Sequence, residues 1–182
     1  MDHYYKRIGE DWFSYPGLYK DMVDSVNMPA HFVEVGTWKG RSAIFMAVEI
    51  INSGYNIKLD CVDTWEGSPE HYETDAVRTY TLYEQFLKNT EPISYMLNHI
   101  RDYSVNASKL YKDESLDFVF IDAAHDYESV KKDINAWFPK IKKGGVIAGH
   151  DYTWCTDVQK AVNEFFEGKS IYESEGCWIF FN

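Results

Sequence analysis

The chain has 182 residues, which is enough for one domain with one core. Its net charge of −11 argues against a DNA partner and, less strongly, against RNA, because phosphate binding needs clustered Lys and Arg. The sequence shows no apolar run near the roughly 20 residues that span a bilayer, and its three cysteines form no CxxC pair. We therefore expect a cytoplasmic protein with no membrane partner; a homo-oligomer is left open.

Strand-like and helix-like segments alternate along the chain. Apolar spacing predicts helices over 16–27, 40–51, 76–88, 107–111, 126–138 and 157–167, and β-rich runs predict strands over 31–36, 57–62, 99–101, 116–121 and 145–149. Residues 170–181 are typical of a hairpin. The pattern predicts one α/β domain with a doubly wound, mostly parallel seven-stranded sheet and a C-terminal antiparallel hairpin. Within it, 1–28 is an N-terminal helical segment and 29–182 a Rossmann-like core.

Polar residues follow the predicted strands where each strand ends. The first strand closes with Glu34 and Gly36, the second with Asp63, the fourth with Asp122, and the fifth with His150-Asp151. In doubly wound sheets, ligands bind outside the carboxyl ends of the strands, where the strand order reverses. We therefore expect these residues to share one site.

The loop after the first strand reads Glu34-Val-Gly-Thr-Trp-Lys-Gly-Arg-Ser42. A dinucleotide fingerprint starting at Gly36 would need glycines where Trp38 and Arg41 stand. The order Lys39-Gly-Arg-Ser42 also differs from the Gly-Lys-Ser/Thr of a P-loop. The loop therefore fits a nucleoside with a small zwitterionic arm better than a diphosphate, and an NAD(P)-dependent oxidoreductase is the less favoured alternative.

Four ordered motifs carry a family resemblance. They are E-x-G-x-x-x-G from Glu34, followed by 62–67 (VDTWEG), 118–127 (FVFIDAAHDY) and 144–151 (GGVIAGHD). Over about 32–152, the chain resembles class I methyltransferases that use S-adenosylmethionine (SAM), and among them the small O-methyltransferases of the macrocin and catechol types.

The resemblance implies a set of SAM contacts. Glu34 would face the methionine ammonium, Gly36 would pass close to the same arm, and Asp63 would take both ribose hydroxyls. Trp65 or Ser104 would contact the adenine. The full expected set is Glu34, Gly36, Thr37, Trp38, Gly40, Ser42, Asp63, Thr64, Trp65, Ser104 and Asp122. Simpler roles remain open: Glu34 could pair with Lys39 or Arg41, Gly36 could serve only the turn, and Asp63 could cap a turn.

Methyl transfer to a hydroxyl also requires the hydroxyl to lose a proton. Asp122, His125 and His150 are the catalytic candidates, although His125 could equally be a helix-start histidine bonded to the backbone. The resemblance further implies Mg²⁺ or another divalent cation at Asp122, His150 and Asp151. An imidazole in that set would tolerate a softer ion than Mg²⁺.

The acceptor is expected to be a hydroxyl of a small molecule or a sugar. Methyltransferases of nucleobases and protein amides usually carry an Asn/Asp-Pro-Pro-aromatic motif after the fourth strand, where this chain has Asp122-Ala-Ala-His125. The loop 66–78, which includes Ser68, Glu70 and His71, and the segment 152–155 would shape the acceptor pocket. A non-catalytic SAM-binding module is the remaining alternative.

Overall fold

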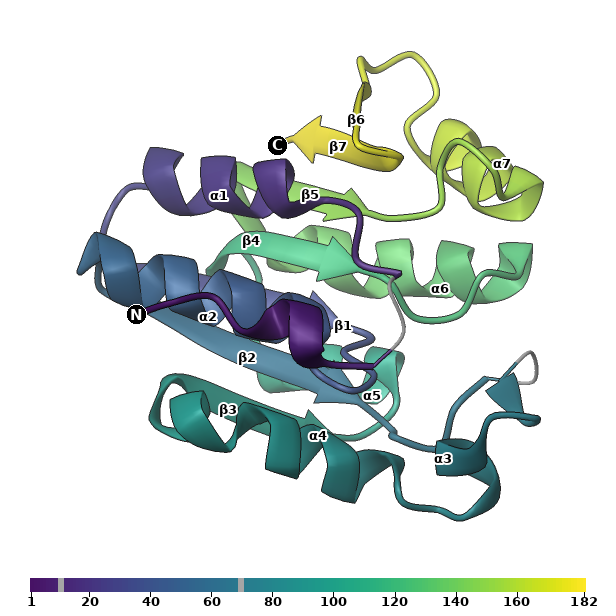
Figure 1. Cartoon of the computed structure of the whole chain (residues 1–182). Helices are drawn as coiled ribbons and strands as arrows, with labels where there is room; N and C mark the ends of the chain where they lie inside the picture. The colour runs from purple at the N-terminus through teal and green to yellow at the C-terminus, as the bar shows by residue number, and fades with distance from the viewer. Residues whose placement is uncertain (10–11, 69–70) are drawn as a thin grey trace.

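A single mixed sheet organises the protein (Figure 1). The computed structural model describes residues 1–9, 12–68 and 71–182, and within them seven strands pair in the order β3-β2-β1-β4-β5-β7-β6. The strands are β1 (Ala30–Val35), β2 (Ile57–Asp63), β3 (Leu97–Arg101), β4 (Leu116–Ile121), β5 (Ile141–Gly149), β6 (Tyr172–Ser174) and β7 (Cys177–Phe181). Strands β1 to β5 are parallel, and β7 runs antiparallel to β5 and β6. The predicted doubly wound sheet and its terminal hairpin are confirmed.

The α-helices are α1 (Pro16–Ser25), α2 (Arg41–Ser53), α3 (Asp75–Arg78), α4 (Leu82–Thr90), α5 (Ser104–Ala107), α6 (Tyr127–Trp137) and α7 (Thr156–Phe165). The helix predicted over 76–88 is two helices, because Tyr80 adopts a left-handed conformation (φ +57°) between them. None of the helices formed by the described residues is long and apolar enough to cross a bilayer.

The core has two layers because successive side chains of a strand point to opposite faces of the sheet. Phe118 and Phe120 of β4 face the layer formed with α1 and α2, whereas Val119 faces the layer formed with α6 and α7. All three side chains are fully buried. Since helices cover both faces, the carboxyl ends of the parallel strands form the edge where a ligand can enter.

A polar cluster centred on Asp60 of β2 lies on the face of the sheet that α6 and α7 cover. The Asp60 side chain is 1% exposed, and its carboxylate accepts a hydrogen bond from Tyr111 at 2.7 Å. His31 Nε2 lies 2.8 Å from the same carboxylate, and Lys58 Nζ lies 3.1 Å away. Burial alone would raise the pKa of Asp60, but the bonds from His31 and Tyr111 lower it to about 2.

We predict that Asp60→Asn lowers the free energy of unfolding by roughly 2 kcal/mol at pH 7. Because the pKa of Asp60 is lower in the folded protein, its contribution is present above about pH 4 and is lost as the pH falls towards 2. Urea unfolding at pH 7 and pH 3 should therefore show a smaller difference between wild type and variant at pH 3. Lys58→Gln, which removes a half-exposed partner, is the control and should change stability by less than about 0.5 kcal/mol. A pH-independent loss in Asp60→Asn would contradict the prediction.

Candidate active site at the strand ends

The tips of β1 and β4 are in direct contact through Gly36. The amide of Asp122 donates to Val35 O at 2.7 Å, and the amide of Gly36 donates to Val62 O at 2.8 Å. A Cβ atom at Gly36 would lie 1.9 Å from the carbonyl oxygen of Asp122, and Gly36 has φ +87°. Both the close approach and the left-handed backbone require glycine here. The glycine therefore serves the packing of the strand tips, whatever it also does for a ligand.

Asp63 at the end of β2 holds the loop that follows β1. Its Oδ2 accepts hydrogen bonds from the amides of Thr37 at 2.8 Å and Trp38 at 2.9 Å, and its Oδ1 accepts from the amide of Trp65 at 2.7 Å. Burial raises the pKa of Asp63, although these amide bonds oppose the shift. The turn-capping role considered for Asp63 is thus present in the structure. Oδ2 already accepts two amide bonds, so a ligand hydroxyl would bond to Oδ1, which accepts from Trp65 alone among these three amides.

One cavity of about 750 Å³ opens along the strand tips, within the usual range for small-molecule sites. Most of the residues expected from the sequence line it. They are Gly36, Thr37, Trp38, Ser42, Asp63, Thr64, Ser104, Asp122, His125, His150 and Asp151. The hydroxyl of Ser104 accepts a hydrogen bond from Trp137 Nε1 at 2.9 Å. The cavity joins the first three strand tips to the residues that follow β4 and β5.

Glu34 does not line this cavity. It is fully buried, and its Oε1 accepts a hydrogen bond from the hydroxyl of Tyr19 on α1 at 2.8 Å. No described residue hydrogen-bonds to its Oε2. Burial raises the pKa of Glu34 to about 8. Of the two acids expected to hold opposite ends of one ligand, Asp63 therefore lines the cavity, whereas Glu34 lies outside its wall against Tyr19 of α1.

Two further expected contacts also lie outside the cavity wall. The ring of Trp65 is 3% exposed and packs in the core against Tyr83 and Phe86, each with ring centroids 4.7 Å away. Its Nε1 donates to the carbonyl of Trp38 at 3.0 Å, so Trp65 supports the first loop from behind. Gly40 precedes α2 with φ +84°, and a Cβ there would meet Thr90 at 2.8 Å. The predicted loop after β1 lines the cavity, but the sequence does not show which of its residues and neighbours face the cavity.

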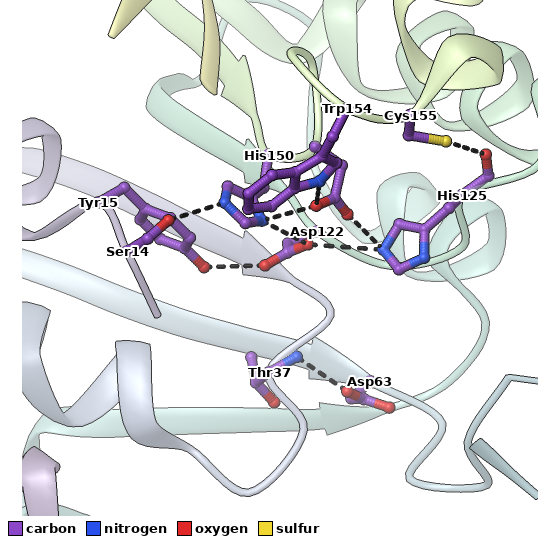
Figure 2. A network of polar contacts seen from close by, with 10 residues as sticks. Ser14, Tyr15, Thr37, Asp63, Asp122, His125, His150, Trp154 and Cys155 are labelled. Carbon is purple, nitrogen blue, oxygen red and sulfur yellow. Dashed lines mark hydrogen bonds and ion pairs between the residues drawn. The ribbon is translucent and has the colours of Figure 1, made fainter. Parts of the chain in front are cut away.

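His125 joins two carboxylates at the tips of β4 and β5 (Figure 2). Its Nε2 lies 2.8 Å from Asp151 Oδ2 and 3.8 Å from Asp122 Oδ1. The carboxylates of Asp122 and Asp151 raise the pKa of His125 to about 11. Burial favours the neutral form of Asp151, but the bonds from His125 and His150 hold its pKa well below the usual range. The imidazole of His125 thus lies between two carboxylates.

The same three residues form a group that could hold a metal ion. One ligand atom from each of Asp122, His125 and Asp151 lies within 4.8 Å of the others. His150, which the sequence placed in this set, is not a member of that group, although its Nδ1 lies 3.1 Å from Asp151 Oδ1 and 3.8 Å from Asp122 Oδ1. Its Nε2 lies 3.0 Å from the hydroxyl of Ser14. The imidazole of the group that could hold a metal is thus His125, while His150 contacts the same two carboxylates.

The sequence does not decide the role of the N-terminal segment, which forms one wall of the cavity. Trp12, Phe13 and Tyr15 line it. The hydroxyl of Tyr15 donates to Asp122 Oδ2 at 2.9 Å, and the Tyr15 ring is 2% exposed (Figure 2). The dense aromatic content of residues 12–19 was the available signal, but nothing in the sequence connects this segment to a residue more than 100 positions later.

The loops expected to shape the pocket are partly in place. Gly67, Ser68 and His71 line the cavity, whereas Glu70 lies outside the described residues. The rings of Trp12, Trp38 and His71 form an aromatic wall, with centroids 4.6 to 5.7 Å apart. Trp154 is 65% exposed, contacts the His150 ring edge-on and hydrogen-bonds to Asp151.

We predict that His125 remains protonated in the metal-free protein up to about pH 10, because two carboxylates stabilise its imidazolium. Asp151→Asn should lower the pKa of His125 by at least about 2 units. Long-range ¹H–¹⁵N NMR of the imidazole, recorded with a chelator present, measures both values. Ser14→Ala, which removes a contact of His150 only, is the control and should leave the His125 titration unchanged. Titration of wild-type His125 near pH 6.5 would contradict this account of the cluster.

Comparisons with known proteins agree with the fold. A family model described as a methyltransferase domain matches residues 33–152. The uncharacterized protein R132 of Acanthamoeba polyphaga mimivirus is 26% identical over 137 residues, which cover 73% of this chain and 58% of R132. The chain thus matches less than two thirds of the length of this relative.

Solved structures share the fold at low sequence identity. The O-methyltransferase NovP superposes with a TM-score of 0.73 at 17% identity, over 93% of this chain and 79% of NovP. The methyltransferase MycE from the mycinamycin biosynthetic pathway, in complex with Mg, SAH and mycinamycin VI, superposes with a TM-score of 0.61 at 12% identity, over 96% of this chain and 50% of MycE. At these identities the likeness shows the fold alone. The family match decides between the two enzyme classes that the sequence left open, and on this evidence the chain belongs to the methyltransferase domain family, in its class I, SAM-dependent branch.

Proposed function

We propose that the protein transfers a methyl group from SAM to a hydroxyl of a small molecule or sugar. The observation that carries the proposal is that one cavity joins the Asp63-held loop to the cluster of Asp122, His125 and Asp151. The first part fits a nucleoside donor and the second fits a hydroxyl that must lose a proton. The O-methyltransferase NovP and the MycE complex with mycinamycin VI support this class of acceptor.

The cavity wall offers SAM a buried hydroxyl whose hydrogen-bonding capacity is unsatisfied. Thr37 is 2% exposed and lines the cavity, yet its Oγ1 has no hydrogen-bond partner among the described residues. A buried hydroxyl without a partner is costly, so a ligand atom that bonds to it gains affinity. We assign Thr37 and Ser42 to the methionine arm, Asp63 to the ribose and Ser104 to the adenine end.

Bound SAM supplies a methyl group on a sulfonium, which is already a good leaving group. The remaining tasks of the protein are to align the acceptor oxygen and to remove its proton. While His125 is protonated it donates a hydrogen bond and cannot act as a base. Asp122 is therefore our candidate base. Tyr15 donates to its Oδ2, and its Oδ1 is directed toward His125.

A divalent cation would be held by Asp122, His125 and Asp151. Two carboxylates and one imidazole make a mixed oxygen and nitrogen set, which suits Mg²⁺ and also Mn²⁺ or similar ions. Binding would require His125 to lose its proton, so the affinity should rise with pH. The chemistry supplied by such an ion is that of a Lewis acid, which lowers the pKa of a nearby hydroxyl.

We predict that Thr37→Val weakens SAH binding about tenfold, because it removes one hydrogen bond to the ligand. The melting temperature of the ligand-free protein should not fall, because the hydroxyl has no partner there to lose. Isothermal titration calorimetry and thermal unfolding measure the two quantities. Thr90→Val is the matched control: its buried hydroxyl donates to Phe86 O at 2.8 Å, so it should lower stability and leave SAH affinity unchanged. If saturating SAM does not raise the wild-type melting temperature, the cofactor assignment fails.

The metal assignment leads to a separate prediction. His125→Gln should weaken Mn²⁺ binding, measured by electron paramagnetic resonance, at least about tenfold, whereas His150→Gln should weaken it much less. With an acceptor found by screening phenols and sugar derivatives for SAH release, a chelator should abolish turnover and Mg²⁺ or Mn²⁺ should restore it. Turnover that is insensitive to the chelator would indicate a metal-free mechanism with Asp122 as the base.

A further inference from the structure

The start of α1 is held by a carboxylate from the opposite end of the chain. Oε2 of Glu175 accepts a hydrogen bond from the amide of Leu18 at 2.9 Å, and its Oε1 accepts from the amide of Gly17 at 3.3 Å. Glu175 lies in the turn between β6 and β7, the yellow hairpin of Figure 1. The first amides of a helix have no partner within the helix, and a carboxylate there also interacts favourably with the helix dipole.

Two backbone features show that this contact is specific. Ser174 pairs with Cys177, so Glu175 (φ +53°) and Gly176 (φ +79°) form a two-residue hairpin loop with both φ angles positive. Such loops favour Asn, Asp or Gly at the first position, and glutamate is strained there. In addition, a Cβ atom at Gly17 would lie 2.9 Å from Glu175 Oε1. Gly17 on α1 therefore leaves space for the carboxylate of Glu175, although glutamate is not a residue that this hairpin turn favours.

The two residues before α1 reach the candidate active site. Tyr15 directly precedes Pro16, and its hydroxyl donates to Asp122 Oδ2. Ser14 Oγ lies 3.0 Å from His150 Nε2. The Tyr15 ring also packs on His150, with ring centroids 4.8 Å apart. A shift of the first turn of α1 would therefore move contacts to Asp122 and to His150 together.

We propose that Glu175 is a positioning residue for the active site. By fixing the first turn of α1, it sets Tyr15 against Asp122 Oδ2 and leaves Asp122 Oδ1 directed toward His125. The N-terminal wall of the cavity is thus held in place by the C-terminal hairpin. The kinetic part of this proposal depends on the methyl-transfer function proposed above, whereas the structural part does not.

The test compares Glu175→Asn with Glu175→Gln. Asparagine suits the left-handed turn position but is too short to reach α1, so it keeps the hairpin and removes the contact. Glutamine keeps the reach and one acceptor oxygen. In Glu175→Asn, hydrogen exchange should accelerate at least about tenfold at the amides of Gly17 and Leu18 but not within β7. In Glu175→Gln, the remaining acceptor oxygen should keep exchange at Leu18, whose bond is the shorter, within about threefold of wild type, while Gly17 loses its acceptor. Unchanged exchange at Gly17 and Leu18 in Glu175→Asn would overturn the proposal.

A double-mutant cycle with Tyr15→Phe tests the route to Asp122. Phenylalanine keeps the ring packing and removes the hydroxyl. We expect Glu175→Asn to lower kcat about tenfold, with the KM for SAM within about twofold, and to add little to the effect of Tyr15→Phe. Fully additive losses would show that Glu175 does not act through Tyr15. If wild-type protein transfers no methyl group to any acceptor, the proposed function fails, while the exchange experiment still decides the role of Glu175.

Discussion

The candidate site depends on the contact between Gly36 and the carbonyl of Asp122. Any side chain at position 36 would separate the tips of β1 and β4, because even a Cβ atom would overlap the Asp122 carbonyl. The backbone bonds from Asp122 to Val35 and from His150 to Ile121 extend this alignment across β4 to β5. The residues after β4 and β5 therefore meet the loop after β1 at one edge of the sheet, and the cavity opens there because the strand order reverses between β1 and β4.

Electrostatics divides the acids near this edge into two kinds. Glu34 is buried against α1, and burial raises its pKa to about 8, so the neutral carboxyl is favoured at neutral pH. Asp151 lies beside two imidazoles that hold its pKa low, so it stays ionised. In a chain of net charge −11, the imidazole of His125 provides the local positive charge that stabilises such a cluster.

The alternation of strands and helices and the polar strand ends were sufficient to predict the sheet and to place Asp63, Asp122 and Asp151 at one edge. Sequence position gives the strand tip but not the direction of a side chain. For this reason the candidate metal group contains His125, which the sequence placed only among the catalytic candidates, and Trp65 proved to be a core residue. The contact of Tyr15 with Asp122 could not be predicted at all, because it depends on how α1 packs across the finished sheet.

The aromatic wall has an optical consequence. Of the six tryptophans, all of which the structure describes, Trp65, Trp137 and Trp178 are at most 3% exposed in the core. Trp12 and Trp38 line the cavity. A ligand that enters the cavity changes the polarity around these two indoles and leaves the core indoles in the same surroundings. The intrinsic fluorescence of the protein is thus a label-free reporter of cavity occupancy, with Trp12→Phe and Trp38→Phe available to assign the signal.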